Sequence, residues 1–439
     1  MNKNKVTKLN TLEQNFQSNL NKLLRNEQEI NIGIHNTVLN IIKQIQEFGD
    51  KALLDFVDKY DGIKVDKIEQ LNISQKQLKS AYNSLNNNEK QALELAASRI
   101  RSFHQHQIPT DLEYQDDVKV DLGLKYSPVN SCGFYVPGGK AIYPSSVLMN
   151  AIPANVAGVN RRIVVSPISD LNKSKIVLAA AYIAGVTDFI CMGGAHAIAT
   201  LAYGTETIDK VDKIVGPGNA YVAEAKRQVF GKVGIDSIAG PSEVLIVCDG
   251  TANPDHVAID LLSQAEHDEE AQAILITDSK EVASKVEVSV QNYLADLKRS
   301  KIASSSWYNN GAIIIVKDID EAIGLVNFIA PEHLELIFKN AKQSLNKIKN
   351  AGAIFIGHNT PEAIGDYIAG PNHVLPTNGT AKFSSGLGVI DFYKRTTIVN
   401  CNKESLGIIG KHAITLAEAE GLEAHAMSIA LRINKYLSK

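Results

Sequence analysis

Short apolar segments that alternate with helical segments constrain the fold of this chain more than any other feature. The alternation begins at about Gly133 and continues through most of the remaining sequence. It is typical of a parallel sheet, because parallel strands are joined by crossover connections that usually contain a helix. The expected strands are Ile163–Val165, Phe189–Met192 and Lys213–Val215 in a first unit, and Val244–Val247, Ala273–Thr277, Ala312–Val316, Leu334–Phe338 and Ala353–Gly357 in a second. The sequence therefore predicts an α/β protein.

The regions outside this alternation are predicted to be mostly helical, with strands from Val118 onward. Residues 1 to about 30 read as a weakly apolar helical arm that needs a partner to bury its leucines. Amphipathic spacing predicts a helix from Val38 that breaks near Gly49 and resumes through Val57. We expect one long helix from Gln75 to about His106, and a mostly helical region from Ser384 to Lys439.

Length, charge and cysteine content exclude several classes of protein. With 439 residues the chain is expected to form two or more domains. A net charge of -3 gives no reason to expect a nucleic acid or an anionic membrane as partner. The cysteines are dispersed without a CxxC motif, which fits neither a disulfide framework nor a thiolate zinc site; they are Cys132, Cys191, Cys248 and Cys401. Without an apolar signal segment or a run of about 18 apolar residues, a cytoplasmic protein is expected.

Two glycine-rich turns follow predicted strands and are candidates for ligand contacts. They are Gly193-Gly194-Ala195-His196 and Gly216-Pro217-Gly218-Asn219. Glycine lets the backbone approach a ligand, and a helix N-terminus beyond the turn favours phosphate. Neither turn matches the GxGxxG dinucleotide motif with an acidic residue about 20 positions later. From the pattern alone, tight packing turns remain an alternative to a dinucleotide site.

The stretch from Gly240 to His267 combines a buried strand with a helix that ends in polar side chains. Asn253 is a suitable N-cap for this helix and Pro254 suits its first position. Gln264 and His267 are three residues apart and share a helix face, so they could hold a metal or a polar ligand. The alternative is a surface helix whose last turn carries a histidine near the negative end of the helix dipole.

Adjacent to a predicted strand, Glu332 and His333 form a candidate general-base pair. Histidine titrates near neutrality, and a partly buried glutamate can be raised into that range. The alternative is an ordinary helix start, with Pro331 at the first position and Glu332 in the first turn.

Asp366 and His373 lie in a loop dense in glycine and proline, where ligand-binding groups are often displayed. They could equally be a helix cap and a solvated histidine. His425, on the last predicted helix, could be an ordinary surface or core residue. Together, Gln264, His267, Asp366 and His425 would offer two nitrogen and two oxygen ligands, a set that Zn²⁺ accepts. Sequence spacing alone does not show that they meet in space.

Taken together, these segments resemble the histidinol dehydrogenase family, in family order from about residue 30 to the end. The matching motifs are Tyr135-Val136-Pro137-Gly138-Gly139, Gly193-Gly194-Ala195, Asp212-Lys213-Ile214-Val215-Gly216-Pro217-Gly218-Asn219, Glu224-Ala225-Lys226-Arg227, Gly240-Pro241-Ser242-Glu243, Leu262-Ser263-Gln264-Ala265-Glu266-His267, Ala330-Pro331-Glu332-His333-Leu334, Gly370-Pro371-Asn372-His373-Val374-Leu375-Pro376-Thr377 and Glu420-Gly421-Leu422-Glu423-Ala424-His425. Such a set is far more specific than any motif within it.

The resemblance implies two hydride transfers to NAD, which take L-histidinol through bound L-histidinaldehyde to L-histidine in the last steps of histidine biosynthesis. It implies one zinc per subunit, held by Gln264, His267, Asp366 and His425. It also implies His333 as the base for the alcohol and Glu332 as the base for the water that hydrates the aldehyde. The implied substrate contacts are Ser242, Gln264, His267, Glu332, His333, Asp366, His373, Glu420 and His425, and the implied NAD contacts are Tyr135, His196 and Asn219.

The family fold implied by the resemblance is a homodimer with shared active sites. Each subunit has two incomplete Rossmann-like domains, aldehyde-dehydrogenase-like in plan, with small helical N- and C-terminal extensions. The implied boundaries are 1–29 for the N-terminal helical arm, 30–132 with 242–387 for the substrate and zinc domain, 133–241 for the NAD-binding domain and 388–439 for the C-terminal helical extension. One position departs from the family, which usually has Gln where His196 stands.

Two other functions are compatible with the same residues. One is a zinc- and NAD-dependent dehydrogenase of this family that acts on another amino alcohol. The other is a catalytically idle relative that binds zinc or a ligand, against which the retention of Glu332, His333 and the four ligand residues argues. None of the cysteines stands in a polar motif, so a carboxylate-activated water is the consistent route for oxidising an aldehyde.

Overall fold

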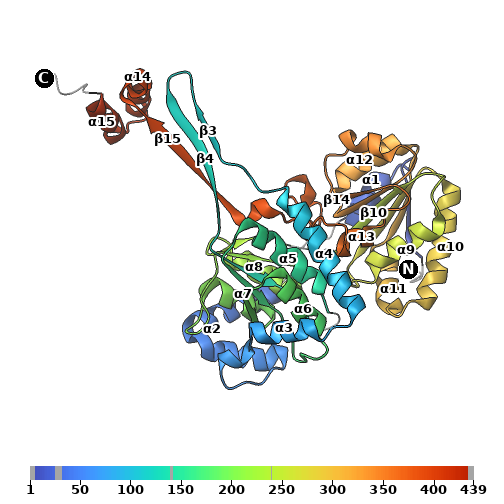
Figure 1. Ribbon diagram of the computed structural model, residues 1–439. Helices are drawn as coiled ribbons and strands as arrows, with labels where there is room; N and C mark the ends of the chain where they lie inside the picture. Colours follow the sequence, from blue (N-terminus) through green and yellow to red (C-terminus); the bar gives the residue numbers. More distant parts are fainter. Residues whose placement is uncertain (1–4, 25–31, 139–141, 239, 434–439) are drawn as a thin grey trace.

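The computed structural model describes residues 5–24, 32–138, 142–238 and 240–433. Within them, two six-stranded sheets form the centres of two α/β units that lie side by side (Figure 1). The first sheet has the order β2 (Asn72–Ile73), β7 (Asp188–Ile190), β6 (Arg161–Val165), β5 (Ser131–Tyr135), β8 (Lys213–Val215) and β9 (Gly234–Ile235). The second has the order β1 (Thr7–Asn10), β12 (Ala312–Ile315), β11 (Gln272–Thr277), β10 (Glu243–Cys248), β13 (His333–Ile337) and β14 (Ala353–Ile356).

The strands are parallel in both sheets except for β2, which pairs antiparallel with β7. In each sheet the chain leaves a central strand in one direction and later returns to its other side. The central strands are β5, flanked by β6 and β8, and β10, flanked by β11 and β13. Such a reversal is the topological switch point at which open α/β sheets commonly bind ligands.

Helices cover both faces of each sheet, which explains why the strands are almost entirely apolar. The first sheet is covered by α3 (Gln75–Asn83), α4 (Asn87–Gln105), α5 (Pro144–Ala157) and α6 (Lys175–Ala184) on one face and by α2 (Ile32–Phe56), α7 (Gly194–Tyr203) and α8 (Ala220–Val229) on the other. The second is covered by α9 (Pro254–Ala265), α10 (Lys280–Asp296) and α11 (Ser300–Asn310) on one face and by α1 (Phe16–Leu24) and α12 (Ile319–Ile329) on the other.

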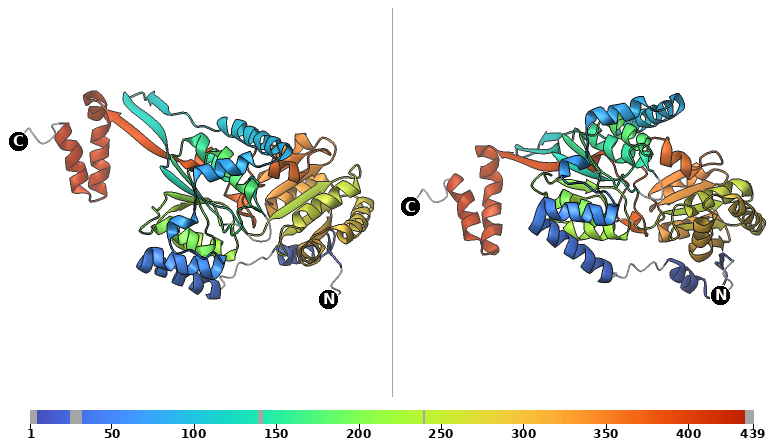
Figure 2. Two further views of the ribbon diagram at one scale, coloured as in Figure 1. Left: turned by 60° about the horizontal axis from the view of Figure 1, so that its bottom comes forward. Right: turned by 90° about the horizontal axis from the view of Figure 1, so that it is seen from below.

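A separate extension projects from the first unit (Figures 1 and 2). Its three-stranded sheet has the order β15 (Tyr393–Cys401), β4 (Val120–Pro128) and β3 (Leu112–Gln115), and all pairs are antiparallel. At its far end α14 (Lys403–Ala419) packs against α15 (Glu423–Arg432) around a small cluster of Ile414, Ala426 and Ala430. In the described part of the chain, no helix is long and apolar enough to cross a membrane.

The predicted α/β alternation is confirmed, and every predicted strand of both units is present within one or two residues of its expected bounds. The predicted break at Gly49 is also confirmed, because Gly49 has φ +50° and ψ -125° inside α2. The expected helix from Gln75 to His106 is instead two helices. Asn86 starts the second one by accepting a hydrogen bond from Glu89 N–H in a capping box.

The sequence prediction missed the strands β1, β2, β3, β9 and β15. β1 lies in the arm expected to be wholly helical, and it extends the second sheet by pairing with β12. The arm therefore buries Leu9, Phe16 and Leu20 against its own chain. β15 lies in the region expected to be mostly helical. Some predicted segments lie outside the described residues: both ends of the N-terminal arm (1–4 and 25–29) and the end of the last predicted helix (434–437). Gly139 of the motif Tyr135-Val136-Pro137-Gly138-Gly139 also lies outside them.

The helices α2 to α4 pack on the first sheet, together with elements from residues 131–235. Leu78, Leu93 and Ile100 of α3 and α4 are buried in the cluster that also contains Phe134 of β5. The grouping of residues 30–132 with 242–387 that the family resemblance implies stays a prediction.

Candidate active site

The candidate site lies where β10 and β13 begin, and the second sheet holds its central groups by backbone contacts. Val244 and His333 are paired in register at the start of these strands. The Nδ1 atom of His333 lies 2.9 Å from the Glu243 carbonyl oxygen. Because a carbonyl only accepts, Nδ1 carries the proton of the neutral ring, and Nε2 is left as the acceptor. This Nε2 atom is buried without a hydrogen-bond partner.

Glu332 is held by the same strand end. Its Oε2 atom accepts a hydrogen bond of 2.8 Å from Glu243 N–H and lies 3.7 Å from His333 Nδ1. Burial raises the pKa of Glu332 to about 8, although His333 and the Glu243 N–H oppose the shift. A carboxyl group in this range can exchange a proton near neutrality, as a general base requires.

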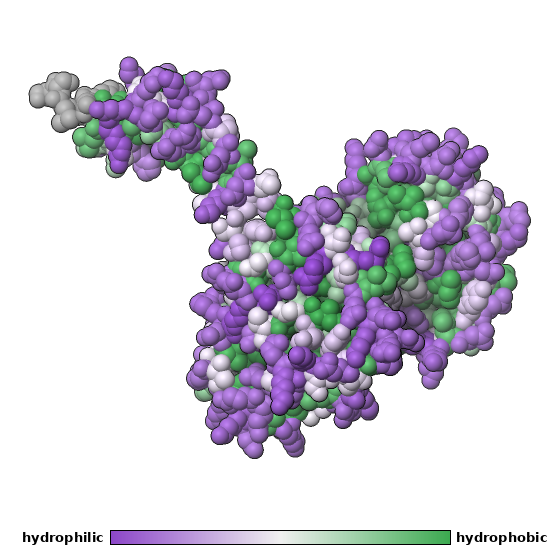
Figure 3. Space-filling model, viewed as in Figure 1, coloured by the Kyte–Doolittle hydropathy of each residue, from purple (hydrophilic) through white to green (hydrophobic). Residues whose placement is uncertain are grey.

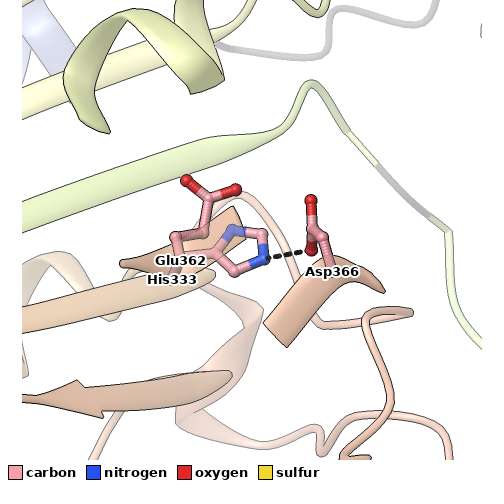
Figure 4. A group of neighbouring side chains, drawn as sticks. All are labelled: His333, Glu362 and Asp366. Carbon is pink, nitrogen blue, oxygen red and sulfur yellow. Dashed lines mark ion pairs between the residues drawn. The ribbon is translucent and has the colours of Figure 1, made fainter. Parts of the chain in front are cut away.

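Three side chains form a compact cluster of possible metal ligands: His333, Glu362 and Asp366 each offer an atom within 4.8 Å of the others. Figure 4 shows the His333 ring between the two carboxylates, with Nε2 3.7 Å from Asp366 Oδ1. Glu362 and Asp366 are one turn apart on α13 (Glu362–Tyr367). Their i, i+4 spacing places both carboxylates on one helix face, toward His333.

The charges in this cluster shift its pKa values in opposite directions. Burial would lower the pKa of His333, but Glu332, Glu362 and Asp366 raise it well above its ordinary value. Burial would raise the pKa of Asp366, but His333, His373 and His267 bring it below its ordinary value. Burial raises the pKa of Glu362 to about 7. The metal-free cluster therefore keeps Asp366 ionised beside a protonated His333.

The last turn of α9 faces this cluster, because α9 packs against α13. Gln264 is completely buried, and both polar atoms of its carboxamide lack a hydrogen-bond partner. His267 follows α9, and its pKa is lowered by desolvation against the opposing effect of Asp366. A buried amide without partners is costly, at roughly 1–3 kcal/mol, so its presence calls for a ligand.

The remaining predicted site residues divide into two groups. His373 lies beside Asp366, and its Nδ1 atom is 3.0 Å from the Asp366 carbonyl oxygen. Ser242 directly precedes Glu243 in the chain. Glu420 and His425 lie instead on the far end of the extension, at the C-cap of α14 and on α15, where both are exposed. Figure 1 shows these helices well away from α9 and α13. One chain therefore brings the end of α9, with Gln264 and then His267, against α13, which carries Asp366, and leaves His425 on the extension.

The predicted cofactor contacts are gathered around the carboxyl ends of the first sheet. Tyr135 ends β5, and its hydroxyl accepts a hydrogen bond of 3.1 Å from Gly194 N–H. His196 is almost fully buried, and its Nε2 lies 2.9 Å from Asp61 Oδ2, which also accepts from Gly193 N–H. Asn219 caps α8 by accepting from Tyr221 N–H and Val222 N–H.

Comparison with known proteins decides the family. The sequence model of histidinol dehydrogenase matches residues 23–433. The chain belongs to the histidinol dehydrogenase family. It is 51% identical over 427 residues to histidinol dehydrogenase 1 of Trichormus variabilis, covering 97% of this chain and 98% of that one. It is 53% identical over 414 residues to the histidinol dehydrogenase of Rhodospirillum rubrum, covering 94% and 95%.

A crystal structure of histidinol dehydrogenase from Elizabethkingia anophelis has the same fold, with a TM-score of 0.92, 34% identity and 99% of both chains covered. These comparisons confirm the resemblance found in the sequence. They also confirm that the chain belongs to a family of oxidoreductases.

Three groups that shape the site of this chain were missed in the sequence analysis. Glu362 was available from its i, i+4 spacing to Asp366. Glu243 was available as a carboxylate at the start of an otherwise apolar strand, and burial raises its pKa to about 7. Asp61, the partner of His196, had no local signal because 135 residues separate them.

Proposed function

We propose that this chain oxidises L-histidinol to L-histidine through L-histidinaldehyde, with two molecules of NAD and one zinc per subunit. The observation that carries the proposal is the buried, unpartnered carboxamide of Gln264 beside α13, which also carries Asp366. An apolar residue would fill that space at lower cost, so the amide is explained by a ligand that takes its oxygen.

The donor set fits zinc. Gln264 and Asp366 offer oxygens and His267 offers a nitrogen, which leaves room in a tetrahedral or five-coordinate shell for further ligands. Glu362, in the cluster with Asp366 and His333, is a candidate for orienting these ligands. When bound, zinc would hold and orient the substrate and favour the deprotonated forms of nearby groups.

The first half-reaction needs a base for the alcohol proton. Nδ1–H of His333 is fixed by the Glu243 carbonyl, and Nε2 has no hydrogen-bond partner, so the ring is oriented for proton abstraction once Nε2 is deprotonated. His333 takes the hydroxyl proton while the carbinol carbon gives a hydride to the nicotinamide ring. A cation at Asp366 lowers the pKa of His333 toward the range in which it acts as a base.

The second half-reaction needs a water. Glu332, as a buried carboxylate beside His333, removes a proton from the water that adds to the aldehyde carbon, and the hydrate then releases its hydride to a second NAD. Cys132 and Cys191 lie in the first unit, Cys248 ends β10 away from the site, and Cys401 lies on the extension. No described cysteine is thus placed to form a thiohemiacetal with this aldehyde.

In this proposal the first unit binds the cofactor, and the second unit binds the zinc and the substrate. Each unit is an incomplete Rossmann-like domain, and together they have an aldehyde-dehydrogenase-like plan. Tyr135 and Asn219 stand on either side of the β5–β8 switch point, where a dinucleotide would bind. His196 is buried against Phe56 and Tyr60 and paired with Asp61. We infer that His196 supports the turn at Gly193 through Asp61, and that its Nδ1 atom remains as a hydrogen-bond acceptor for the cofactor.

The proposal includes a cytoplasmic homodimer in which the partner's extension completes each site. The extension exposes many apolar side chains, which is unusual for an isolated surface. They are Leu112, Tyr114, Ile398, Val399, Ile408, Leu416, Leu422, Met427 and Leu431. Figure 3 shows apolar side chains on the narrow part of the molecule that joins the extension to the first unit. A second subunit that covers them would also bring its Glu420 and His425 positions to the zinc.

Metal analysis tests the proposal directly. We expect about one zinc per subunit, and at least the 10 to 100-fold loss of zinc affinity that even outer-shell damage causes when His267 is changed to Asn or Gln264 to Ala. His256→Asn, an exposed histidine on α9, is the matched control and should keep its zinc. Normal zinc content in both His267→Asn and Gln264→Ala would contradict the proposal.

A further inference from the structure

The turn between β8 and α8 occupies the switch point of the first sheet. The chain runs from β5 through β6 to β7 on one side and through β8 to β9 on the other. Tyr135 is the last residue of β5, and Gly216 directly follows β8. Both residues therefore lie at the carboxyl ends of two neighbouring strands, the edge at which open α/β sheets bind ligands.

Gly216 lies unusually close to the backbone of Tyr135 on the neighbouring strand. Its φ is +116°, and a Cβ atom added to it would lie 2.2 Å from the Tyr135 carbonyl oxygen. Only glycine fits this position without displacing the backbone of β5. The backbone leaves the regular strand here, so the N–H and C=O groups of Gly216 need partners other than the sheet.

A buried ion pair supplies both partners. Asp236 Oδ2 accepts a hydrogen bond of 2.8 Å from Gly216 N–H, and Lys226 Nζ donates one of 3.0 Å to Gly216 C=O. Lys226 and Asp236 also pair with each other, and their side chains are only 3% and 6% exposed. Asp236 directly follows β9, and Lys226 lies in the last turn of α8. The two peptide groups that flank the Gly216 Cα are thus held by opposite charges, one by Asp236 and the other by Lys226.

A buried ion pair is weak evidence for stability, because the cost of removing two charges from water offsets most of their attraction. This pair does, however, hold Gly216 shortly before Asn219, which caps the first turn of α8. The ammonium group of Lys226 is buried and already used, so it acts on a ligand through Gly216 rather than by contact.

We propose that Lys226 and Asp236 are positioning residues for the dinucleotide: by holding Gly216 they fix the path of the chain from the carboxyl end of β8 to the N-terminus of α8. This inference rests on the proposed use of NAD. A misplacement of about 1 Å can cost as much as 10²-fold in a positioned complex. Loss of the two hydrogen bonds that hold Gly216 should therefore weaken NAD binding while leaving the zinc and histidinol contacts of the second unit intact.

The test uses the zinc-loaded enzyme and the variant Lys226→Met/Asp236→Asn, which removes both charges without leaving one buried and unpaired. We expect the Kd for NAD, measured by calorimetry, and the KM for NAD to rise at least about tenfold. Zinc content and the KM for histidinol should stay within about twofold, and so should kcat at saturating NAD. The control Glu281→Gln/Lys285→Met removes an exposed i, i+4 pair on α10 and should change nothing.

Lys226→Arg keeps the positive charge beside Asp236 but replaces the ammonium group by a planar guanidinium group. It therefore tests the hydrogen bond to the Gly216 carbonyl in a chain that still has both charges. We expect it to raise the Kd for NAD with little change in melting temperature. Unchanged NAD binding in a folded Lys226→Met/Asp236→Asn protein overturns the inference. If that protein does not fold, unchanged NAD binding in Lys226→Arg overturns it instead. Absence of NAD binding by the unmodified enzyme would reject the proposed function rather than this assignment.

Discussion

At the scale of single residues, the site depends on Glu243 as much as on the two proposed bases. Its carbonyl fixes the tautomer of His333, its N–H holds Glu332, and its carboxylate accepts from Asn378 N–H. A single residue at the start of β10 thus orients both bases through its backbone. This arrangement separates their roles, since His333 offers a ring nitrogen and Glu332 a carboxylate oxygen.

Substituting the two bases should affect different half-reactions. Glu332→Gln should slow oxidation of supplied histidinaldehyde about 10²–10⁴-fold and alcohol oxidation much less, because only the aldehyde step needs a deprotonated water. His333→Asn should mainly slow the alcohol step. Glu281→Gln, an exposed carboxylate on α10, serves as the control. A Glu332→Gln enzyme that oxidised the aldehyde at full rate would exclude Glu332 as the base for water.

The buried carboxyl groups also predict how stability depends on pH in the metal-free protein. The native pKa values of Glu243 and Glu362 are about 7 and that of Glu332 is about 8, against an ordinary value of 4.5. Between those values the folded chain binds more protons than the unfolded chain, so these groups make the free energy of unfolding fall as pH rises. The lowered pKa values of His267 and His373 act in the opposite direction.

Glu362→Gln isolates one of these contributions. The stability of the unmodified chain relative to this variant should fall between about pH 5 and pH 8, measured by urea unfolding after chelation. Two curves that remain parallel across this range would show that Glu362 does not carry a raised pKa.

At the scale of elements, the turn after β8 should tolerate no side chain. Gly216→Ala would place Cβ against the carbonyl oxygen of Tyr135, which belongs to the backbone and cannot rotate away. Gly62→Ala is the control, because Gly62 also has positive φ but no atom within 4 Å of an added Cβ. We expect Gly62→Ala to cost about 1 kcal/mol of unfolding free energy and Gly216→Ala at least about 2 kcal/mol more. Equal losses in denaturant unfolding would contradict the close approach.

Elements that carry their own pattern were predictable from the sequence, and elements defined by distant partners were not. β10 and β11 are apolar runs bounded by turns, and α9 has both Asn253 and Pro254 at its start. β15 is exposed along nearly its whole length and is fixed by pairing with β4, about 270 residues earlier. No local periodicity reports such a pairing. The same limit applies to His196 and Asp61, whose contact follows from the packing of α7 on α2 and the turn after it.

At the scale of the whole molecule, the position of His425 is the main consequence of the fold. Local chemistry places it in a ligand set with Gln264, His267 and Asp366, yet the extension carries it away from the unit that holds the other three. The spacing of residues in the sequence could suggest the set but could not show which chain supplies each member. A closed two-fold dimer would supply each site with the missing histidine.

Complementation between two inactive variants tests this exchange. When His425→Asn and His333→Asn chains are co-expressed with different tags, the purified heterodimer should have one intact site, formed by the His333-containing body of one chain and the intact extension of the other. We expect about half of the wild-type activity per dimer. A heterodimer of Glu332→Gln and His333→Asn is the control and should stay inactive, because each body carries a lesion. Absence of activity in both heterodimers would contradict a shared site.

In the proposed function, one zinc site carries histidinol through two successive oxidations. The most direct measurement counts the NADH formed per L-histidinol consumed, with histidine and histidinaldehyde quantified in the same samples. We expect two NADH and one histidine per histidinol, with no free aldehyde released. One NADH per histidinol with accumulating aldehyde, or no NADH from histidinol at all, would contradict it.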